Sequence, residues 1–455
     1  MTSPRPQTVR EQAFHVLVEA ANSEEFAETL IEKIAAASDI RDLTRLRYLV
    51  TTVIRRKLTL ESVLKQFVNR VIEPDLWILL KLGTAQVLLG ASDHRHADVN
   101  ETVEVARRIG KPHWCKLLNG VLRNIDRDCT DESPSKFASN VYPAQTIDEL
   151  RLLKRDHFPN PDKDFAGYVS AAFSLPRWLI DRWQKQFDQE QLLKIANWFL
   201  SSPRMCLRVN LNKISRDKLL TLFAEGDSQG RLGNVATSLL DIETNSVTQL
   251  PGWETGLFSV QDETAQQAAP TLNPQPGETV LDLCAAPGTK TIHLAELMNF
   301  EGSIIAADVS EDRLSKVREN AKRCDAKLIE TVQIGYEGDD FPAGPFDRIL
   351  IDAPCTNTGV LGKRVDARWR ISPADIQELS QLQLRLLTQA ASHLKPGGRI
   401  LYSTCSLEPE ENERVVEQFL KTNTQFVCTS QKLYLPGSPS DGGFQALLTH
   451  QTATD

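Results

Sequence analysis

Two cysteine-bearing segments and one strand-loop-helix pattern carry the residues whose types and spacing suit chemistry. The cysteine segments are Asp352-Ala353-Pro354-Cys355 and Ser403-Thr404-Cys405-Ser406, and the pattern, residues 280–290, is typical of a loop that holds a nucleoside cofactor. Cytosine C5 is too poor a nucleophile to be methylated directly, so an enzyme that attacks it first adds a thiolate to C6. A cysteine beside a methyl donor is what that reaction needs.

The expected cofactor loop follows an apolar strand and leads into a helix. Gly288 opens that helix, where backbone N–H groups could hold an anion such as the carboxylate of a methionine moiety. Asp308 lies twenty residues further on, at the end of the next expected strand, where an acidic side chain can accept hydrogen bonds from ribose hydroxyls. A dinucleotide site would favour three glycines, so a single glycine favours S-adenosylmethionine over NAD. An aspartate that ends a strand also arises for turn reasons alone.

Each cysteine also has an ordinary structural interpretation. A free cysteine is most often a small buried hydrophobe. Cys355 and Cys405, however, both follow expected strands that would end at one edge of a sheet, which favours a joint chemical role over packing. Lys290, beside the cofactor loop, could be a solvated lysine at a helix start. The run 363–370 interleaves cations with Trp369 and suits phosphates and an unpaired base, or else forms a plain surface loop.

The elements that would position these residues alternate regularly from about residue 277 onward. Expected strands and helices follow one another over residues 279–283 and 291–298, 303–307 and 311–323, 346–351 and 373–393, and 399–404 and 410–420. Repeated units of this kind predict a parallel, doubly wound α/β sheet with helices on both faces. Ligands bind such sheets at the carboxyl ends of the strands. Four residues would lie at or just beyond those ends: Asp282, Asp308, Asp352 and Cys405.

The first 130 residues have a helical period and predict an all-α domain. Residues 131–165 read as a linker, and residues 166–255 as a small α+β subdomain ahead of the α/β domain, residues 256–455. The polar helix faces of the first domain carry ten cations, which form either an RNA-binding surface or ordinary solvated faces: Arg45, Arg47, Arg55, Arg56, Lys57, Arg107, Arg108, Lys111, Lys116 and Arg123.

The composition bears on three classes of protein: polybasic nucleic-acid binders, metal or disulfide proteins, and membrane proteins. The 455 residues carry a formal net charge of −8, which argues against a polybasic nucleic-acid binder, but residues 1–130 hold 19 Lys and Arg against 17 Asp and Glu. RNA contacts would therefore be local. The eight cysteines form no C-x-x-C pair, so we expect reduced thiols and no metal. Without a long apolar run or a signal-peptide pattern, we expect a cytoplasmic protein that does not enter the membrane.

These segments resemble the RNA cytosine-5 methyltransferase family. The N-terminal helices extend the resemblance to its bacterial members that act on small-subunit (16S) rRNA, since residues 9–127, including the run 118–123, are similar to a NusB-like RNA-binding domain. The resemblance implies a multidomain chain: an all-α NusB-like domain, a small α+β linker subdomain and a C-terminal Rossmann-like α/β methyltransferase domain. It also implies S-adenosylmethionine as cofactor and rRNA as substrate.

The same resemblance implies roles for individual residues. Cys405 is similar to the family's nucleophile, Cys355 would assist release of the product, Asp352 would contact the cytosine N3 edge, and Lys290 would hold the base near the cofactor. The cofactor-binding residues it implies are Cys284, Ala285, Ala286, Pro287, Gly288, Thr289, Lys290, Asp308 and Asp352. Thr289 and Asn357 stand where the family usually has glycine, and a further acidic cofactor contact is expected near residues 335–339.

Two other functions remain open at this point. The catalytic motifs do not encode the substrate, so a tRNA cytosine-5 methyltransferase is an alternative. A non-catalytic RNA-binding or assembly factor with a relic methyltransferase fold is another, because a fold alone does not establish an activity. We expect a monomer.

Overall fold

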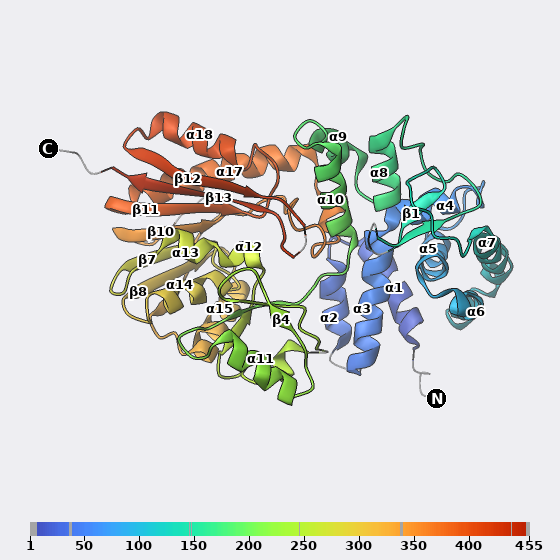
Figure 1. Cartoon of the computed structure of the whole chain (residues 1–455), viewed down its shortest axis with the longest axis horizontal. Helices are drawn as coiled ribbons and strands as arrows, with labels where there is room; N and C mark the ends of the chain where they lie inside the picture. Colours follow the sequence, from blue (N-terminus) through green and yellow to red (C-terminus); the bar gives the residue numbers. More distant parts are fainter. Residues whose placement is uncertain are drawn as a thin grey trace. The chain divides into compact units, whose positions relative to one another are not determined.

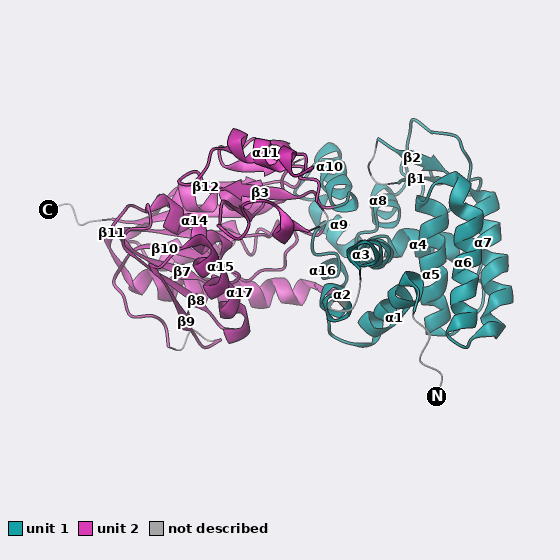
Figure 2. Cartoon of the chain, turned by 90° about the horizontal axis from the view of Figure 1, so that it is seen from below, with its two compact units in different colours: residues 1–202, 362–369 teal, residues 203–361, 370–455 magenta. Residues whose placement is uncertain are grey.

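The computed structural model of the chain describes residues 7–35, 39–144, 146, 148–244, 246–336, 340–437 and 439–451. The chain divides into two compact units, residues 1–202 with 362–369, and residues 203–361 with 370–455 (Figure 2). The short stretch 362–369 thus belongs to the first unit, although the residues on either side of it in the sequence belong to the second.

The first unit begins with a helical bundle built around one apolar helix (Figure 1). That helix, α5 (Pro74–Leu89), is buried along nearly its whole length, as expected for a helix that is apolar all round. The helices of the bundle and its two short 3-10 turns are α1 (Val9–Asn22), α2 (Ala27–Ala35), α3 (Ile40–Arg55), α4 (Lys57–Leu64), η1 (Ser92–His94), α6 (Arg95–Arg108), η2 (Pro112–Trp114) and α7 (Cys115–Asp128). This confirms the predicted all-α domain.

The rest of the first unit is a hairpin and three further helices. Strands β1 (Val141–Pro143) and β2 (Leu150–Leu152) pair antiparallel, and the Tyr142 hydroxyl donates to the Leu88 carbonyl of α5 at 2.9 Å. The helices are α8 (Phe165–Phe173), α9 (Arg177–Trp183) and α10 (Gln189–Leu200). The segment that composition suggests as a linker therefore contributes ordered structure to this unit.

Three arginines that the sequence suggested for RNA contact lie instead in the interior of this unit. Arg55 and Arg56 are 7% and 3% exposed, and Arg368, at the start of the short helix α16 (Ala367–Arg370), is 0% exposed. Arg368 donates to the carbonyls of Arg55, Ser174 and Phe199. A surface role was therefore wrong for all three, because guanidinium groups can be buried when main-chain carbonyls accept their hydrogen bonds.

The second unit opens with a four-stranded antiparallel sheet of order β4-β5-β3-β6. Its elements are β3 (Cys206–Val209), α11 (Arg216–Glu225), β4 (Arg231–Leu232), β5 (Ser238–Leu240), η3 (Val247–Gln249) and β6 (Phe258–Val260). An α+β subdomain was predicted over residues 166–255, but its first helices, α8, α9 and α10, belong to the first unit, and only its part from residue 203 onward lies in this one. Arg208 of β3 is fully buried and binds both carboxylate oxygens of Glu296, with Nη2 at 3.0 Å and Nε at 3.1 Å.

The larger sheet of this unit has seven strands in the order β12-β13-β11-β10-β7-β8-β9. The elements are α12 (Glu263–Gln266), α13 (Ala268–Leu272), β7 (Thr279–Leu283), α14 (Thr289–Leu297), β8 (Ser303–Asp308), α15 (Glu311–Cys324), β9 (Ile329–Gln333), β10 (Phe346–Asp352), α17 (Pro373–Ser392), β11 (Leu394–Thr404), α18 (Glu413–Thr422), β12 (Phe426–Tyr434) and β13 (Gly443–His450). Four strands were predicted to run parallel and do so, namely β7, β8, β10 and β11, and β9, which was not predicted, joins them in parallel. Strand β13 is antiparallel to both β11 and β12, so the sheet is mixed.

Helices cover both faces of this sheet. Leu281, Ile349 and Ile400 pack with α17 and α18 on one face, whereas their neighbours in sequence, Val280, Leu350 and Leu401, pack with α13 and α14 on the other. Burial on both faces explains why apolar residues predominate at successive positions of the central strands. Among the described helices, none is both long and apolar enough to cross a membrane.

Candidate active site

The two cysteines of the sequence motifs meet at the carboxyl ends of β10 and β11. These strands pair in parallel, with Asp352 opposite Ser403, so the loops that follow them leave the sheet side by side. The Sγ atoms of Cys355 and Cys405 lie 3.2 Å apart. A pairing that the sequence could only suggest from strand order is therefore a direct contact.

The environments of the two thiols differ. Cys355 is buried, and its pKa is raised well above the ordinary value by its hydrogen bond with Cys405 and by burial. Cys405 is only partly buried and lines a cavity of about 70 Å³ together with Lys290, Thr404 and Phe444. A reagent or substrate in that cavity would meet Cys405 as its nucleophile.

Lys290 and Asp352 form an ion pair beside the thiols. Burial lowers the pKa of Lys290, but the charge of Asp352 and its hydrogen bond outweigh burial, and the net shift is upward. Lys290 is therefore a cation at neutral pH. A cation beside a cysteine favours the thiolate, which is the reactive form.

The expected cofactor loop lies between the end of β7 and the start of α14. Cys284 has a positive φ of 62° and Gly288 one of 93°, and a Cβ at Gly288 would come within 3.0 Å of Val317. Glycine is therefore required at this turn. Helix α14 begins at Thr289, so its free N–H groups face the loop formed by Cys284, Ala285, Ala286 and Pro287.

Asp308, at the end of β8, is tied to this loop. Its carboxylate accepts hydrogen bonds from the Ala286 amide at 3.2 Å, the Ser310 amide at 3.1 Å and the Arg313 guanidinium at 3.3 Å. The side chain is almost fully buried. A carboxylate oxygen can accept two hydrogen bonds, so Asp308 Oδ2, which accepts one, has capacity for a ribose hydroxyl. The ribose contact of Asp308 stays a prediction.

Asp282 was expected at a strand end near a ligand, but the sequence indicated no specific role for it. It is fully buried in β7, and Oδ2 accepts from the Thr291 hydroxyl at 2.6 Å, while Oδ1 has no hydrogen-bond partner among the described residues. Burial raises its pKa from 3.8 to about 7. An unpaired buried acceptor next to an anion-binding loop fits a ligand that carries both an ammonium and a carboxylate group, as S-adenosylmethionine does.

Glu411, a residue whose role the sequence did not indicate, joins the loops that carry the two cysteines. Its buried carboxylate accepts from the Thr356 amide at 2.9 Å, from the Thr356 and Ser406 hydroxyls, and from Gln383 at 3.1 Å. Burial raises its pKa, although these hydrogen bonds lower it in part. The sequence offered one signal, since Glu411 lies in the acidic run after Cys405.

Two further expectations concern an acidic cofactor contact and a metal site. Residues 337–339, where the sequence suggested an acidic cofactor contact, lie outside the described residues. Within the ranges that the structure describes, no three His, Cys, Asp or Glu side chains gather closely enough to hold a metal ion.

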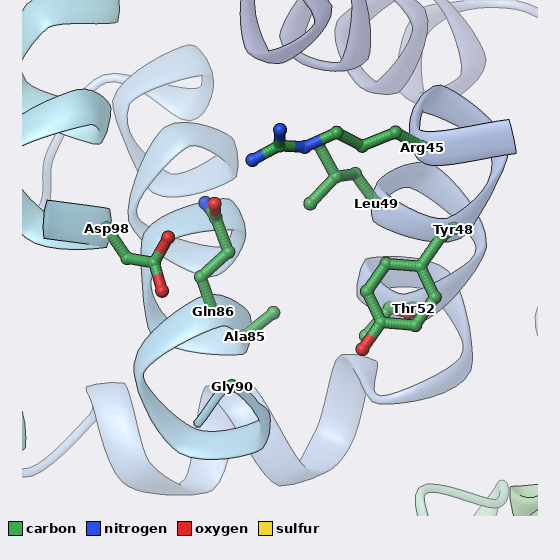
Figure 3. A pocket seen from close by; sticks show the side chains of 8 residues that line it. All are labelled: Arg45, Tyr48, Leu49, Thr52, Ala85, Gln86, Gly90 and Asp98. Atoms are coloured by element: carbon green, nitrogen blue, oxygen red, sulfur yellow. The ribbon is translucent and has the colours of Figure 1, made fainter. Parts of the chain in front are cut away.

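The first unit has a pocket of its own, of about 150 Å³ (Figure 3). Arg10 fixes two of its lining residues, with Nε donating to Gln86 at 2.7 Å and Nη2 bound to Asp98 at 2.7 Å. Arg45 reaches from α3 toward Gln86, and Tyr48, on the same helix, is 45% exposed. The lining residues are Arg45, Tyr48, Leu49, Thr52, Ala85, Gln86, Gly90 and Asp98.

Three protein-family models match the chain in succession. Residues 7–127 match the NusB family, residues 175–247 match the RsmF/B-like ferredoxin-like domain, and residues 269–450 match the 16S rRNA methyltransferase RsmB/F model. The third match covers the residues of the candidate active site, from Asp282 to Glu411, and not the pocket of the first unit.

Two curated proteins and one solved structure extend the comparison. The probable ribosomal RNA small subunit methyltransferase B of Bacillus subtilis is 30% identical over 92% of this chain and 89% of its own length. The ribosomal RNA small subunit methyltransferase B of Escherichia coli O1:K1 is 35% identical over 89% and 86%. The fold of NSun6 from Pyrococcus horikoshii, solved with SFG, an analogue of S-adenosylmethionine, matches 61% of this chain and 98% of that chain, at 22% identity and a TM-score of 0.56.

Proposed function

Since the chain belongs to the 16S rRNA methyltransferase family RsmB/F, we propose that it methylates carbon 5 of a cytosine in 16S rRNA. Membership of this family makes the chain an S-adenosylmethionine-dependent RNA methyltransferase. The observation that carries the finer proposal is the pair of thiols 3.2 Å apart, beside the Lys290–Asp352 ion pair. A methyltransferase acting on an amine or a hydroxyl would need no such thiol.

The covalent cycle follows from the chemistry of cytosine. The Cys405 thiolate adds to C6, which turns C5 into an enamine carbon. A donor held by the loop before α14 and by Asp308 would supply the methyl group that C5 takes, with S-adenosylhomocysteine as the by-product. Loss of the C5 proton to a solvent base then restores the C5–C6 double bond and expels the Cys405 thiolate. Cys355, in contact with the same sulfur, assists this last step.

The residues of the chain that would bind the cofactor and the base occupy three strand ends. S-adenosylmethionine supplies an electrophilic methyl group when bound. The loop before α14 would hold its carboxylate at a helix N-terminus, Asp282 its ammonium group and Asp308 its ribose. Asp352 would face the N3 edge of the cytosine, and Lys290 would hold the base near the sulfonium.

The direct test is methyl transfer by the full chain. Purified protein is incubated with methyl-labelled S-adenosylmethionine and 16S rRNA from cells that lack the gene, and the labelled nucleoside is identified after digestion. We expect 5-methylcytidine at a defined position. Label on tRNA alone would favour the tRNA alternative, and absence of both methyl transfer and calorimetric cofactor binding would favour the relic assembly factor.

The two thiol roles predict variants that fail differently. Cys405→Ala should bind RNA reversibly and transfer no methyl group, because no adduct can form. Cys355→Ala should still form the adduct and accumulate a covalent protein–RNA complex on denaturing gels, in the presence of the methyl donor only. A Cys405→Ala/Cys355→Ala double variant is the control and should trap nothing. If Cys405→Ala were the variant that traps RNA, the two assignments would be reversed.

The first unit would contribute RNA affinity. Its NusB-like bundle carries a pocket lined by an exposed aromatic residue, Tyr48, and by a cation, Arg45, and this combination suits one unpaired nucleotide (Figure 3). The pocket is pre-formed, because Arg10 already fixes Gln86 and Asp98.

A further inference from the structure

Asn357 touches both cysteine segments through its side-chain amide. Its Nδ2 donates to the Cys355 carbonyl at 2.8 Å, and its Oδ1 accepts from the Cys405 thiol at 3.2 Å. The residue has a positive φ of 60°, a conformation that asparagine tolerates better than most residues. Its own carbonyl accepts from the Val360 amide at 3.0 Å, which closes a turn.

The two contacts orient the amide. Because Nδ2 is committed to the Cys355 carbonyl, the atom turned toward Cys405 is the acceptor oxygen. An amide oxygen cannot donate, so the bond requires the proton to be on the Cys405 sulfur. The Cys405 Sγ is thereby held between Asn357 Oδ1 and the Cys355 Sγ, each 3.2 Å away.

We propose that Asn357 is a positioning residue for Cys405, holding its sulfur in one place and in the protonated form until the substrate base arrives. This inference rests on the proposed role of Cys405 as nucleophile. Other charged or titratable groups lie around the thiols, namely Lys290, Asp352, Cys355 and Glu411. Among them, Lys290 opposes Asn357, since a cation favours the thiolate whereas an acceptor oxygen favours the thiol.

A glycine substitution at position 357 tests the role of the side chain separately from the role of the turn. Asn357→Gly keeps the positive φ without strain and removes only the amide. A matched control is Asn299→Gly, because Asn299 also has a positive φ, of 52°, is exposed and lies at the end of α14. Asn357→Asp keeps an acceptor toward the thiol and removes the donor to Cys355.

The first readout needs neither RNA nor cofactor. Full-length protein is alkylated with iodoacetamide at neutral pH, and modification of Cys405 is followed by peptide mass spectrometry. We expect Asn357→Gly to react roughly fivefold faster than the wild type, the change that one lost hydrogen bond implies. Asn357→Asp should react more slowly than the wild type, and Asn299→Gly at the wild-type rate.

The second readout is methyl transfer. A sulfur that is no longer fixed attacks less often, so kcat of Asn357→Gly should fall roughly fivefold while KM for RNA and for the cofactor stays unchanged. A Gly variant with either wild-type alkylation or wild-type kcat would overturn the proposal and leave Asn357 as a turn residue only. A wild-type protein that methylates no cytosine would instead refute the proposed function, and the alkylation result would still stand by itself.

Discussion

Replacing Asp282 by asparagine should stabilise the protein, and more so at high pH. Asp282 is fully buried, and burial raises its pKa from 3.8 to about 7. The folded state therefore holds a proton at this carboxyl that the unfolded state has already lost above pH 4. Stability is thus unaffected at low pH and falls as the pH rises from the unfolded value through the folded one. Asparagine keeps an acceptor for the Thr291 hydroxyl and carries no charge.

The size of the effect follows from the pKa difference. With 1.36 kcal/mol for each unit, the cost of the Asp282 charge is about 4 kcal/mol at pH 8 and about 2 kcal/mol at pH 5. The advantage of Asp282→Asn should therefore be about 2 kcal/mol larger at pH 8 than at pH 5. Any change in packing or hydrogen bonding contributes equally at both values and cancels in this difference.

Amide hydrogen exchange in β7 measures this advantage at the strand itself, which avoids assuming that both units unfold together. Variant and wild type are compared at the same pH, so intrinsic exchange rates cancel. The same variant should bind S-adenosylmethionine more weakly, because the unpaired Oδ1 is the acceptor we assign to its ammonium group. An advantage that is equal at pH 5 and pH 8 would refute the assignment of a buried, titrating carboxyl to Asp282.

Three further predictions concern other parts of the chain. Tyr48→Ala should weaken binding of unmethylated rRNA roughly tenfold at fixed salt, and Arg45→Ala should lower the salt slope by about one, both in a filter-binding assay; unchanged affinity in both would exclude the pocket. Glu411→Gln should cost about 1–3 kcal/mol in thermal melts, since its amide cannot accept every hydrogen bond made by the carboxylate, and methyl transfer should fall with it. Arg208→Met should cost about 3–5 kcal/mol, because it leaves the Glu296 carboxylate buried without its partner; a melting temperature equal to the wild type would show that the pair adds nothing.

The central strands of the methyltransferase unit could be predicted from the sequence because each contains a short, mostly apolar run. The prediction of residues 279–283 matches β7, and that of residues 346–351 falls one residue short of β10. Runs of this kind are typical of parallel strands that are buried on both faces. The location of both cysteines at strand ends followed from the same pattern.

The missed strands lack that pattern. Strand β12 is mostly exposed or half-exposed, and its polar residues suggested no strand. Strand β13 pairs antiparallel with β11, a choice of direction that no local signal in its residues encodes. The sequence could therefore not predict that the sheet is mixed, because the direction of a strand depends on its pairing with distant segments.

The hydrogen bonds of buried polar side chains could not be predicted from the sequence either. Arg368 was assigned to the surface because arginine is rarely buried fully, yet its guanidinium finds carbonyls from Arg55, Ser174 and Phe199. The roles of Glu411 and Asp282 could not be predicted for a related reason. They depend on burial and on hydrogen bonds in the folded chain, which spacing along the sequence does not reveal.

The asymmetry between the two thiols is the strongest physical argument for assigning attack to Cys405. Both sulfurs take part in one contact, so proximity alone cannot distinguish them. Burial does, because Cys355 is closed off and its pKa is raised well above the ordinary value, first by its bond to Cys405 and then by burial. Cys405 instead opens on a cavity that also contains Lys290, whose charge stabilises a thiolate. A nucleophile must reach its substrate, and of the two thiols only Cys405 lines this cavity.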